Sequence, residues 1–321
     1  MGLFKPYFSA FPQLPAHLTP PNPPAQHQTA TPVIINQATI VVDVLPIKIS
    51  PFPEMGITKI KKDPQFVLIK QANVDVPVLS VHGYFVKELR TKTPLLDKNS
   101  QDILSIGSLT KLMTVVVAQD ILATSTKITI TPGIIATPGE SGFVEGEIFS
   151  AGDLTKASLI SSVNDAAFAL AKESSKDFVF LMNAKANAIG MSTSNFSDPT
   201  GLDDELNFST ASDIALLAEH ILNNYGGLSK ITIILADKII SQNKKLTHAL
   251  YNTNPLIEAT SSPIFLLSKT GTTERAKECA VLITEINGGQ FLIVLLGSDD
   301  RWSDISKIIS WLSQTYSIEM R

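Results

Sequence analysis

Apolar side chains recur every three or four positions through the middle of the chain and again near its end. This spacing places them on one face of a helix, so each such run predicts a helical segment. The predicted helices are Ser108–Ala123, Leu154–Ser161, Ala166–Lys172, Lys176–Ile189, Ala211–Asn223 and Ser303–Tyr316.

Runs rich in β-branched and aromatic residues flank the helical region on both sides. They predict strands at Gln65–Lys70, Val78–Lys87, Leu89–Leu96, Ile264–Ser268, Cys279–Ile286 and Gln290–Gly297. Gly288 and Gly289 separate the last two runs at the spacing of a hairpin. Strands, then helices, then strands that end in a hairpin indicate an α+β fold. In such a fold an antiparallel β-sheet packs with helices, beside an all-helical cluster.

The first part of the chain has a different composition. Eleven of the 19 prolines lie between Pro6 and Pro53, and proline cannot propagate a helix. We therefore predict that residues 1–64 form a proline-rich tail or spacer with short extended segments, and that residues 65–321 form the folded domain. A docked extra strand or a partner-binding arm is the alternative for the first region.

Composition and charge narrow the function classes. Of the 321 residues, 44% are apolar and 17% are charged, which is typical of a globular protein with a buried core. The formal net charge is −4 and there is no long basic run, which disfavours nucleic-acid binding. Cys279 is the single cysteine, so multi-thiolate metal sites are excluded, and the five histidines lack HExxH spacing. We expect neither a metal nor a cofactor.

Two short polar segments at helix ends carry candidate chemistry. Ser108 and Lys111 stand one turn apart at the start of a predicted helix, where a buried neutral lysine could take the proton of the serine. Ser162 and Asn164 lie in a polar break between two apolar helical runs. Taken singly, each segment also fits an ordinary helix cap or a surface lysine.

A third segment follows the predicted strand Ile264–Ser268. Lys269, Thr270, Gly271 and Thr272 offer a cation, two hydroxyl groups and a glycine beside which a ligand backbone can lie. By itself this segment also fits a hairpin turn. Together and in this order, however, the three segments match the SxxK, SxN and KTG elements of penicillin-binding proteins and serine β-lactamases.

On these motifs the chain resembles the serine D-alanyl-D-alanine carboxypeptidases, which are the low-molecular-mass penicillin-binding proteins. The resemblance covers about Gln65 to Tyr316. It implies a fold like that of the β-lactamases and DD-peptidases, with residues 65–321 as the catalytic domain. The segments that carry it are Ser108–Thr114, Ser162–Ala167, Asp198–Leu202, Ser209–Asp213 and Lys269–Thr273.

The resemblance also implies catalytic roles in an acyl-enzyme mechanism. Ser108 would attack the carbonyl of the penultimate D-alanine, and Lys111 would be the general base. Ser162 would pass a proton to the leaving amine, while Asn164 would hold the substrate amide and Lys111.

Substrate binding is implied for the third motif. Lys269 and Thr270 would bind the substrate carboxylate or tune the field around Ser162, and Gly271 would leave room for the substrate. Backbone N–H groups of Ser108 and Thr272 would form the oxyanion hole.

Two segments depart from the family pattern. Thr253, in Asn252-Thr253-Asn254, stands where many members have a basic residue, which puts carboxylate binding there in question. Lys277 and Glu278 replace small residues that often follow the third motif, and this change would alter the rim of the site.

Three alternative functions share the same motifs. A DD-endopeptidase would use the same serine to cut peptidoglycan cross-links. A β-lactamase would need an ExxLN-type glutamate, and Asn195–Asn207 lacks that arrangement. A non-catalytic penicillin-binding module would have the fold without turnover.

The resemblance further implies partners and a location. The expected partners are peptidoglycan stem peptides, with β-lactam antibiotics as inhibitors, and the expected location is extracytoplasmic, in the periplasm or cell envelope. No signal peptide is visible at the start of the chain, because Pro12 and Pro15 interrupt any apolar core. Val33–Ile49 contains Asp43 and Pro46 and is too short to span a membrane. Membrane association would therefore need an anchor that this sequence does not contain.

Overall fold

The computed structural model describes residues 66–136, 142–259 and 264–320. The predicted spacer at 1–64, with its extended segment Val33–Ile49, lies outside the described residues. All described residues belong to one unit of the chain.

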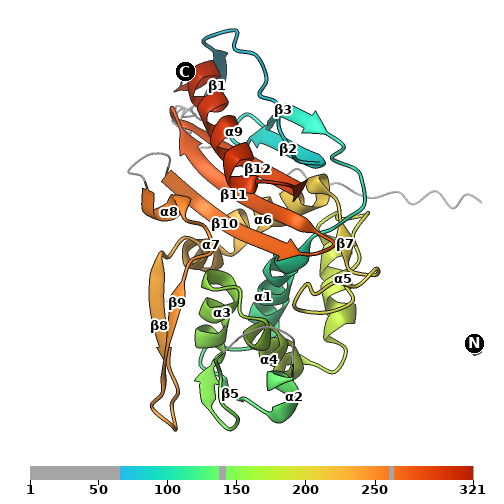
Figure 1. Cartoon of the computed structure of the whole chain (residues 1–321), viewed down its shortest axis with the longest axis vertical. Coiled ribbons are helices and arrows are strands. Elements are labelled where there is room, and N and C mark those ends of the chain that lie inside the picture. The colour runs from blue at the N-terminus through green and yellow to red at the C-terminus, as the bar shows by residue number, and fades with distance from the viewer. Residues whose placement is uncertain (1–65, 137–141, 260–263, 321) are drawn as a thin grey trace, which may run out of the picture. The chain divides into compact units, whose positions relative to one another are not determined.

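A five-stranded antiparallel sheet forms one half of this unit (Figure 1). The strand order is β10 (Ile264–Thr273), β11 (Lys277–Ile286), β12 (Gly289–Ser298), β2 (Gly83–Glu88) and β3 (Thr93–Lys98). Helix α9 (Arg301–Thr315) packs on one face of the sheet and α6 (Ala211–Asn224) on the other. The sheet is therefore buried on both faces.

The sequence of β11 shows why both faces are apolar. Ala280 and Leu282 belong to the core that includes Ile305 of α9. Val281 and Ile283 alternate with them and belong to the larger core of the helical half. Because successive strand residues point to opposite faces, a continuous apolar run supplies both cores.

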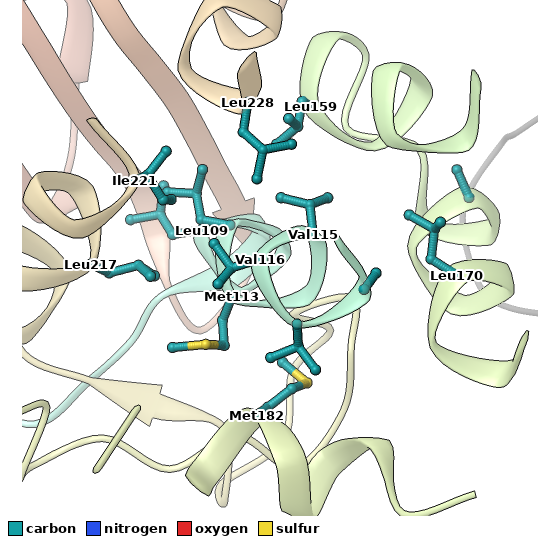
Figure 2. Close-up of a cluster of buried hydrophobic side chains, with 14 of the residues drawn as sticks. Leu109, Met113, Val115, Val116, Leu159, Leu170, Met182, Leu217, Ile221 and Leu228 are labelled. Carbon is teal, nitrogen blue, oxygen red and sulfur yellow. The ribbon is translucent and has the colours of Figure 1, made fainter. Parts of the chain in front are cut away.

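Helix α1 (Thr110–Ile121) is the centre of the helical half. It packs against α3 (Ala151–Ile160), α4 (Asn164–Ser174), α5 (Phe178–Ala188) and α6. Every residue from Thr110 to Ala118 is buried, so the helix is surrounded on all sides rather than amphipathic. Figure 2 shows Met113, Val115 and Val116 of this helix among side chains from its neighbours.

Short elements complete the described chain. Four two-stranded sheets pair β1 (Phe66–Lys70) with β13 (Tyr316–Met320), β4 (Leu104–Ser105) with β7 (Phe208–Ser209), β5 (Lys127–Thr129) with β6 (Ile148–Ser150), and β8 (Ala236–Ile240) with β9 (Thr247–Tyr251). The short helices are η1 (Gly107–Leu109), α2 (Pro132–Ile135), α7 (Gly226–Thr232) and α8 (Leu256–Ala259). None of the helices within the described ranges has the length and apolar character that crossing a membrane requires.

The predicted α+β class and the antiparallel sheet are confirmed. The predicted hairpin is also confirmed, with Asn287 and Gly288 at its turn, both at positive φ. The strand predicted to end at Ser268 instead continues to Thr273, because Lys269 to Thr273 stay paired with β11. Strands β2 and β3 begin five and four residues later than predicted, around a turn at Leu89–Lys92. The hairpin of β8 and β9 was not predicted.

Candidate active site

The three motif segments meet where the sheet faces the helical half. Ser108 lies in η1, directly before α1, and Ser162 lies in the break between α3 and α4. Lys269 lies on β10, the edge strand that packs against η1. Segments far apart in the chain thus contribute to one cluster, and the sequence prediction that they act together fits this arrangement.

Lys111 lies at the centre of the cluster. Its side chain is fully buried, and its Nζ lies 2.7 Å from each of three oxygens, namely Ser108 Oγ, Asn164 Oδ1 and the carbonyl oxygen of Thr200. Burial lowers the pKa of Lys111 to about 7, although the negative charge of Asp198 acts in the opposite direction.

These contacts are compatible with a neutral amine, the form that the lowered pKa makes accessible near neutral pH. The oxygens of Asn164 and Thr200 can only accept hydrogen bonds, so they occupy two N–H groups of Lys111. A neutral amine then has its lone pair left for the remaining neighbour, the hydroxyl of Ser108. The geometry therefore fits a neutral lysine that accepts the serine proton.

The carbonyl of Thr200 is held in place by its own turn. Asp198 Oδ1 accepts hydrogen bonds from the backbone N–H groups of Thr200 and Gly201. Thr114 Oγ1, one turn beyond Lys111 on α1, donates to the Pro199 carbonyl at 2.6 Å. Gly201 has φ +84°, and a Cβ there would overlap the carbonyl oxygen of Gly107. The resemblance had marked this segment, but its contact with the lysine was not predicted.

Ser162 and Lys269 form a second serine–lysine pair. Lys269 Nζ donates to Ser162 Oγ at 2.9 Å and to the Thr270 carbonyl at 2.9 Å. The side chain of Lys269 is buried, and this burial, together with the charges of Lys111 and Arg301, holds its pKa well below the usual value. Ser162 has φ 59°, a conformation that interrupts the path between α3 and α4.

Thr253 also belongs to the site. Its Oγ1 accepts a 2.7 Å hydrogen bond from Thr270 Oγ1. The flanking residues fix this segment, since Asn252 Nδ2 donates to backbone carbonyls and Asn254 Nδ2 donates to Ser268 Oγ at 2.9 Å. At this position, where the resemblance led us to expect a basic residue, the chain presents a pair of hydroxyl groups.

Gly271 brings β10 close to the serine. A Cβ at this position would lie 2.5 Å from the Ile106 carbonyl oxygen and 3.0 Å from the backbone nitrogen of Ser108. From the other side, a Cβ on Gly107 would lie 3.2 Å from the backbone nitrogen of Thr272. The two backbone nitrogens named for the oxyanion hole therefore lie on segments that only glycines allow to approach so closely.

A Gly271→Ala variant should separate these segments. We expect acylation of the serine to slow by about 10²-fold or more, because losing one oxyanion donor has an effect of that order in other enzymes. Stopped-flow acylation by a chromogenic β-lactam measures this rate. Gly226→Ala is the matched control, since a Cβ there meets nothing within 4 Å. Equal rates in the two variants would contradict this account of the glycine.

All eight predicted site residues lie in or beside this cluster. Within the described ranges, no group of three His, Cys, Asp or Glu side chains is placed to hold a metal ion. Cys279 is buried, and burial raises the pKa of its thiol to about 11, so it does not act as a thiolate.

The fold and the two serine–lysine pairs define an active-site-serine protein of the penicillin-binding class. A model of the S11 peptidase family, described as D-alanyl-D-alanine carboxypeptidase, matches residues 70–300. The chain belongs to this family.

Two relatives illustrate the likeness. The D-alanyl-D-alanine carboxypeptidase DacF of Bacillus subtilis is 30% identical over 241 residues, which are 71% of this chain and 61% of the relative. The chain thus spans less than two thirds of that protein. A D-alanyl-D-alanine endopeptidase of Escherichia coli is 30% identical over 250 residues, covering 74% of this chain and 78% of the relative.

Solved structures share the fold. A mutant of the Streptomyces K15 DD-transpeptidase matches with a TM-score of 0.68 and 25% identity, over 73% of this chain and 98% of that one. A D-alanyl-D-alanine carboxypeptidase from Mycobacterium tuberculosis matches with a TM-score of 0.66 and 23% identity, over 75% of this chain and 94% of that one.

Proposed function

We propose that this chain is a serine DD-carboxypeptidase, which removes the terminal D-alanine from peptidoglycan stem peptides through an acyl-enzyme on Ser108. The observation that carries this proposal is the environment of Lys111, whose N–H groups are occupied by Asn164 and Thr200 and whose remaining neighbour is Ser108. Membership of the carboxypeptidase family supports the substrate class.

Acylation begins at Ser108. As Oγ attacks the carbonyl carbon of the penultimate D-alanine, its proton moves to the neutral amine of Lys111. The substrate carbonyl oxygen becomes an oxyanion, which the backbone N–H groups of Ser108 and Thr272 stabilise. Asn164 holds the lysine through Oδ1.

Collapse of this intermediate requires a proton on the leaving amine. The hydroxyl of Ser162 supplies it and takes up in exchange the proton that Lys111 accepted from Ser108, while Lys269 Nζ, 2.9 Å away, stabilises the Ser162 oxygen. Breakage of the C–N bond then releases D-alanine and leaves an ester on Ser108. Water attacks this ester by the same path in reverse, which restores the serine.

The substrate carboxylate binds at Lys269, Thr270 and Thr253. The two hydroxyl groups already form a hydrogen bond with each other at 2.7 Å, and either one can turn to the carboxylate. The lowered pKa of Lys269 rises again when a negative charge arrives beside it. Substrate binding thus charges this lysine where the carboxylate needs a cation.

A β-lactam acylates Ser108 by the same route, because its strained amide takes the place of the peptide bond. Its leaving nitrogen stays tethered to the acyl group, so deacylation is slow. We further propose that the protein acts outside the cytoplasmic membrane, where peptidoglycan lies, on the peptide stems of that polymer.

A DD-endopeptidase is the second candidate. The observation that favours it is the similarity to the Escherichia coli relative that is named an endopeptidase. The serine and the bases would be the same, and the leaving group would be a cross-linking side chain instead of free D-alanine.

Two purified substrates separate these activities. We expect the protein to release D-alanine from a stem pentapeptide that ends in D-Ala-D-Ala, while a cross-linked muropeptide dimer stays intact, as followed by liquid chromatography and mass spectrometry. Protein incubated first with benzylpenicillin is the control and should release neither product. Monomers formed from the dimer would favour the endopeptidase, and no product from either substrate would contradict both proposals.

A further inference from the structure

Arg301 reaches from the first turn of α9 into the strand that carries the third motif. Its Nη1 donates to the Gly271 carbonyl at 2.8 Å and to the Cys279 carbonyl at 3.0 Å. Gly271 and Cys279 face each other across β10 and β11, so one guanidinium nitrogen spans both strands. The side chain of Arg301 is only 11% exposed.

The carbonyl of Gly271 belongs to the same peptide group as the backbone N–H of Thr272. The same planar unit contains the backbone N–H of Thr272, which is one of the two donors of the proposed oxyanion hole. A cation at the carbonyl end draws electron density toward oxygen and makes the N–H a stronger donor, since bonds in a chain polarise one another. The bond also fixes the plane in which the N–H points.

We propose that Arg301 is a positioning residue that orients and polarises the Gly271–Thr272 peptide group toward the oxyanion. This inference rests on the proposed acyl-enzyme function. It assigns to Arg301 an indirect effect on the reaction, through a backbone unit that itself contacts the oxyanion.

Two neighbouring residues, Glu278 and Trp302, hold the Arg301 side chain in position. Glu278 accepts a 2.9 Å hydrogen bond from the backbone N–H of Arg301 and lies 3.7 Å from its Nη2. The guanidinium also lies over the ring of Trp302, 5.2 Å from its centroid. Glu278 is one of the two residues that depart from the family pattern after the third motif, and here it anchors the arginine.

The charge of Arg301 acts on the site as well. It is one of the causes that lower the pKa of Lys269, after burial and the charge of Lys111. Removing the charge would therefore change two separable properties. The strength of the Thr272 N–H donor affects acyl-transfer rates, and the pKa of Lys269 affects the pH profile.

The test compares Arg301→Met, Arg301→Lys and Asp300→Ala with the wild type. Asp300 is the control because its side chain caps α9 by accepting from the Ser303 N–H and does not touch Gly271. The first measurement is the rate constant for acylation by benzylpenicillin. The second is the infrared stretch of the acyl-enzyme ester carbonyl, identified by ¹³C labelling, because stronger hydrogen bonds from the oxyanion hole lower its frequency.

We expect Arg301→Met to slow acylation roughly tenfold, less than complete loss of a donor, and to raise the carbonyl frequency. Arg301→Lys should recover part of both effects, because it keeps a cation in reach of the carbonyl. Asp300→Ala should lower the melting temperature and leave the frequency unchanged.

Three results would overturn the inference. One is an unchanged carbonyl frequency in Arg301→Met, which would make the arginine a structural anchor only. The second is a loss confined to the benzylpenicillin concentration that half-saturates the acylation rate, which would assign the arginine to carboxylate binding. The third is the absence of any adduct in the wild type, which would overturn the proposed function and this inference with it.

Discussion

A Ser108→Ala variant should form no covalent adduct with benzylpenicillin. Ser108 Oγ is the hydroxyl that Lys111 contacts, at 2.7 Å, so the variant has no nucleophile beside the base. Turnover of a D-Ala-D-Ala peptide should fall by on the order of 10⁶-fold, as when the nucleophile of another serine hydrolase is removed. Intact-protein mass spectrometry before and after incubation with the antibiotic measures the adduct.

The control for this variant is Ser105→Ala. Ser105 is the last residue of β4, two positions before η1 begins at Gly107. Removing its hydroxyl leaves the contact between Ser108 and Lys111 in place. It should still gain one adduct per chain. An adduct of the same mass on Ser108→Ala would place the nucleophile elsewhere and contradict the proposed mechanism.

The sequence identified the candidate residues of the site because residue type and local spacing are enough to propose their chemistry. Ser108 and Lys111 are one helical turn apart, and this spacing alone places them on one face. That they lie beside Ser162 and Lys269 is a tertiary contact, which only the order of three motifs made predictable. The resemblance to a known family supplied this tertiary proximity of the three motifs, which local periodicity does not encode.

The residues that sequence reasoning missed contact the candidate site through backbone atoms or come from distant segments of the chain. Thr200 offers a carbonyl oxygen, which every residue has, so its side chain gives no signal. Arg301 lies 30 positions from Gly271 and looks like an ordinary first residue of a helix. Thr253 stands out in the sequence only because it lacks the expected positive charge. Its hydroxyl contact with Thr270 depends on how closely the Thr253 segment lies to β10, which is a tertiary property.

Element boundaries were wrong where local signals and tertiary pairing disagree. Lys269 to Thr273 contain a glycine and polar residues, which favour a turn. They remain in a strand because β11 supplies partners for the whole segment. The hairpin of β8 and β9 contains lysines and other exposed polar residues, so its alternation is weak.

A Lys111→Met variant should slow acylation of Ser108 by about 10²–10⁴-fold, the range for loss of a general base. Methionine keeps an unbranched chain of similar length but has no basic atom. It also removes the N–H donors to Asn164 and Thr200, so we expect a loss of stability of about 1–3 kcal/mol. Thermal unfolding distinguishes this loss from the loss of rate.

Lys172→Met is the matched control for a lost lysine. Lys172 lies on α4, and its Nζ donates to Thr131 Oγ1 at 3.2 Å on an exposed surface. Its acylation rate should equal that of the wild type. If Lys111→Met reacted as fast as this control, a different base would be required.

The pH profile of the wild type tests the same lysine without a mutation. Burial lowers the pKa of Lys111 to about 7, so the amine is neutral above that pH and protonated below it. Only the neutral form can accept the proton of Ser108. The rate of acylation should therefore be level above about pH 7 and fall tenfold per pH unit as the pH drops below that value.

A rate that kept rising with pH up to the ordinary lysine pKa of 10.5 would mean that burial does not deprotonate this residue. A rate that stayed level well below pH 7 would exclude Lys111 as the base.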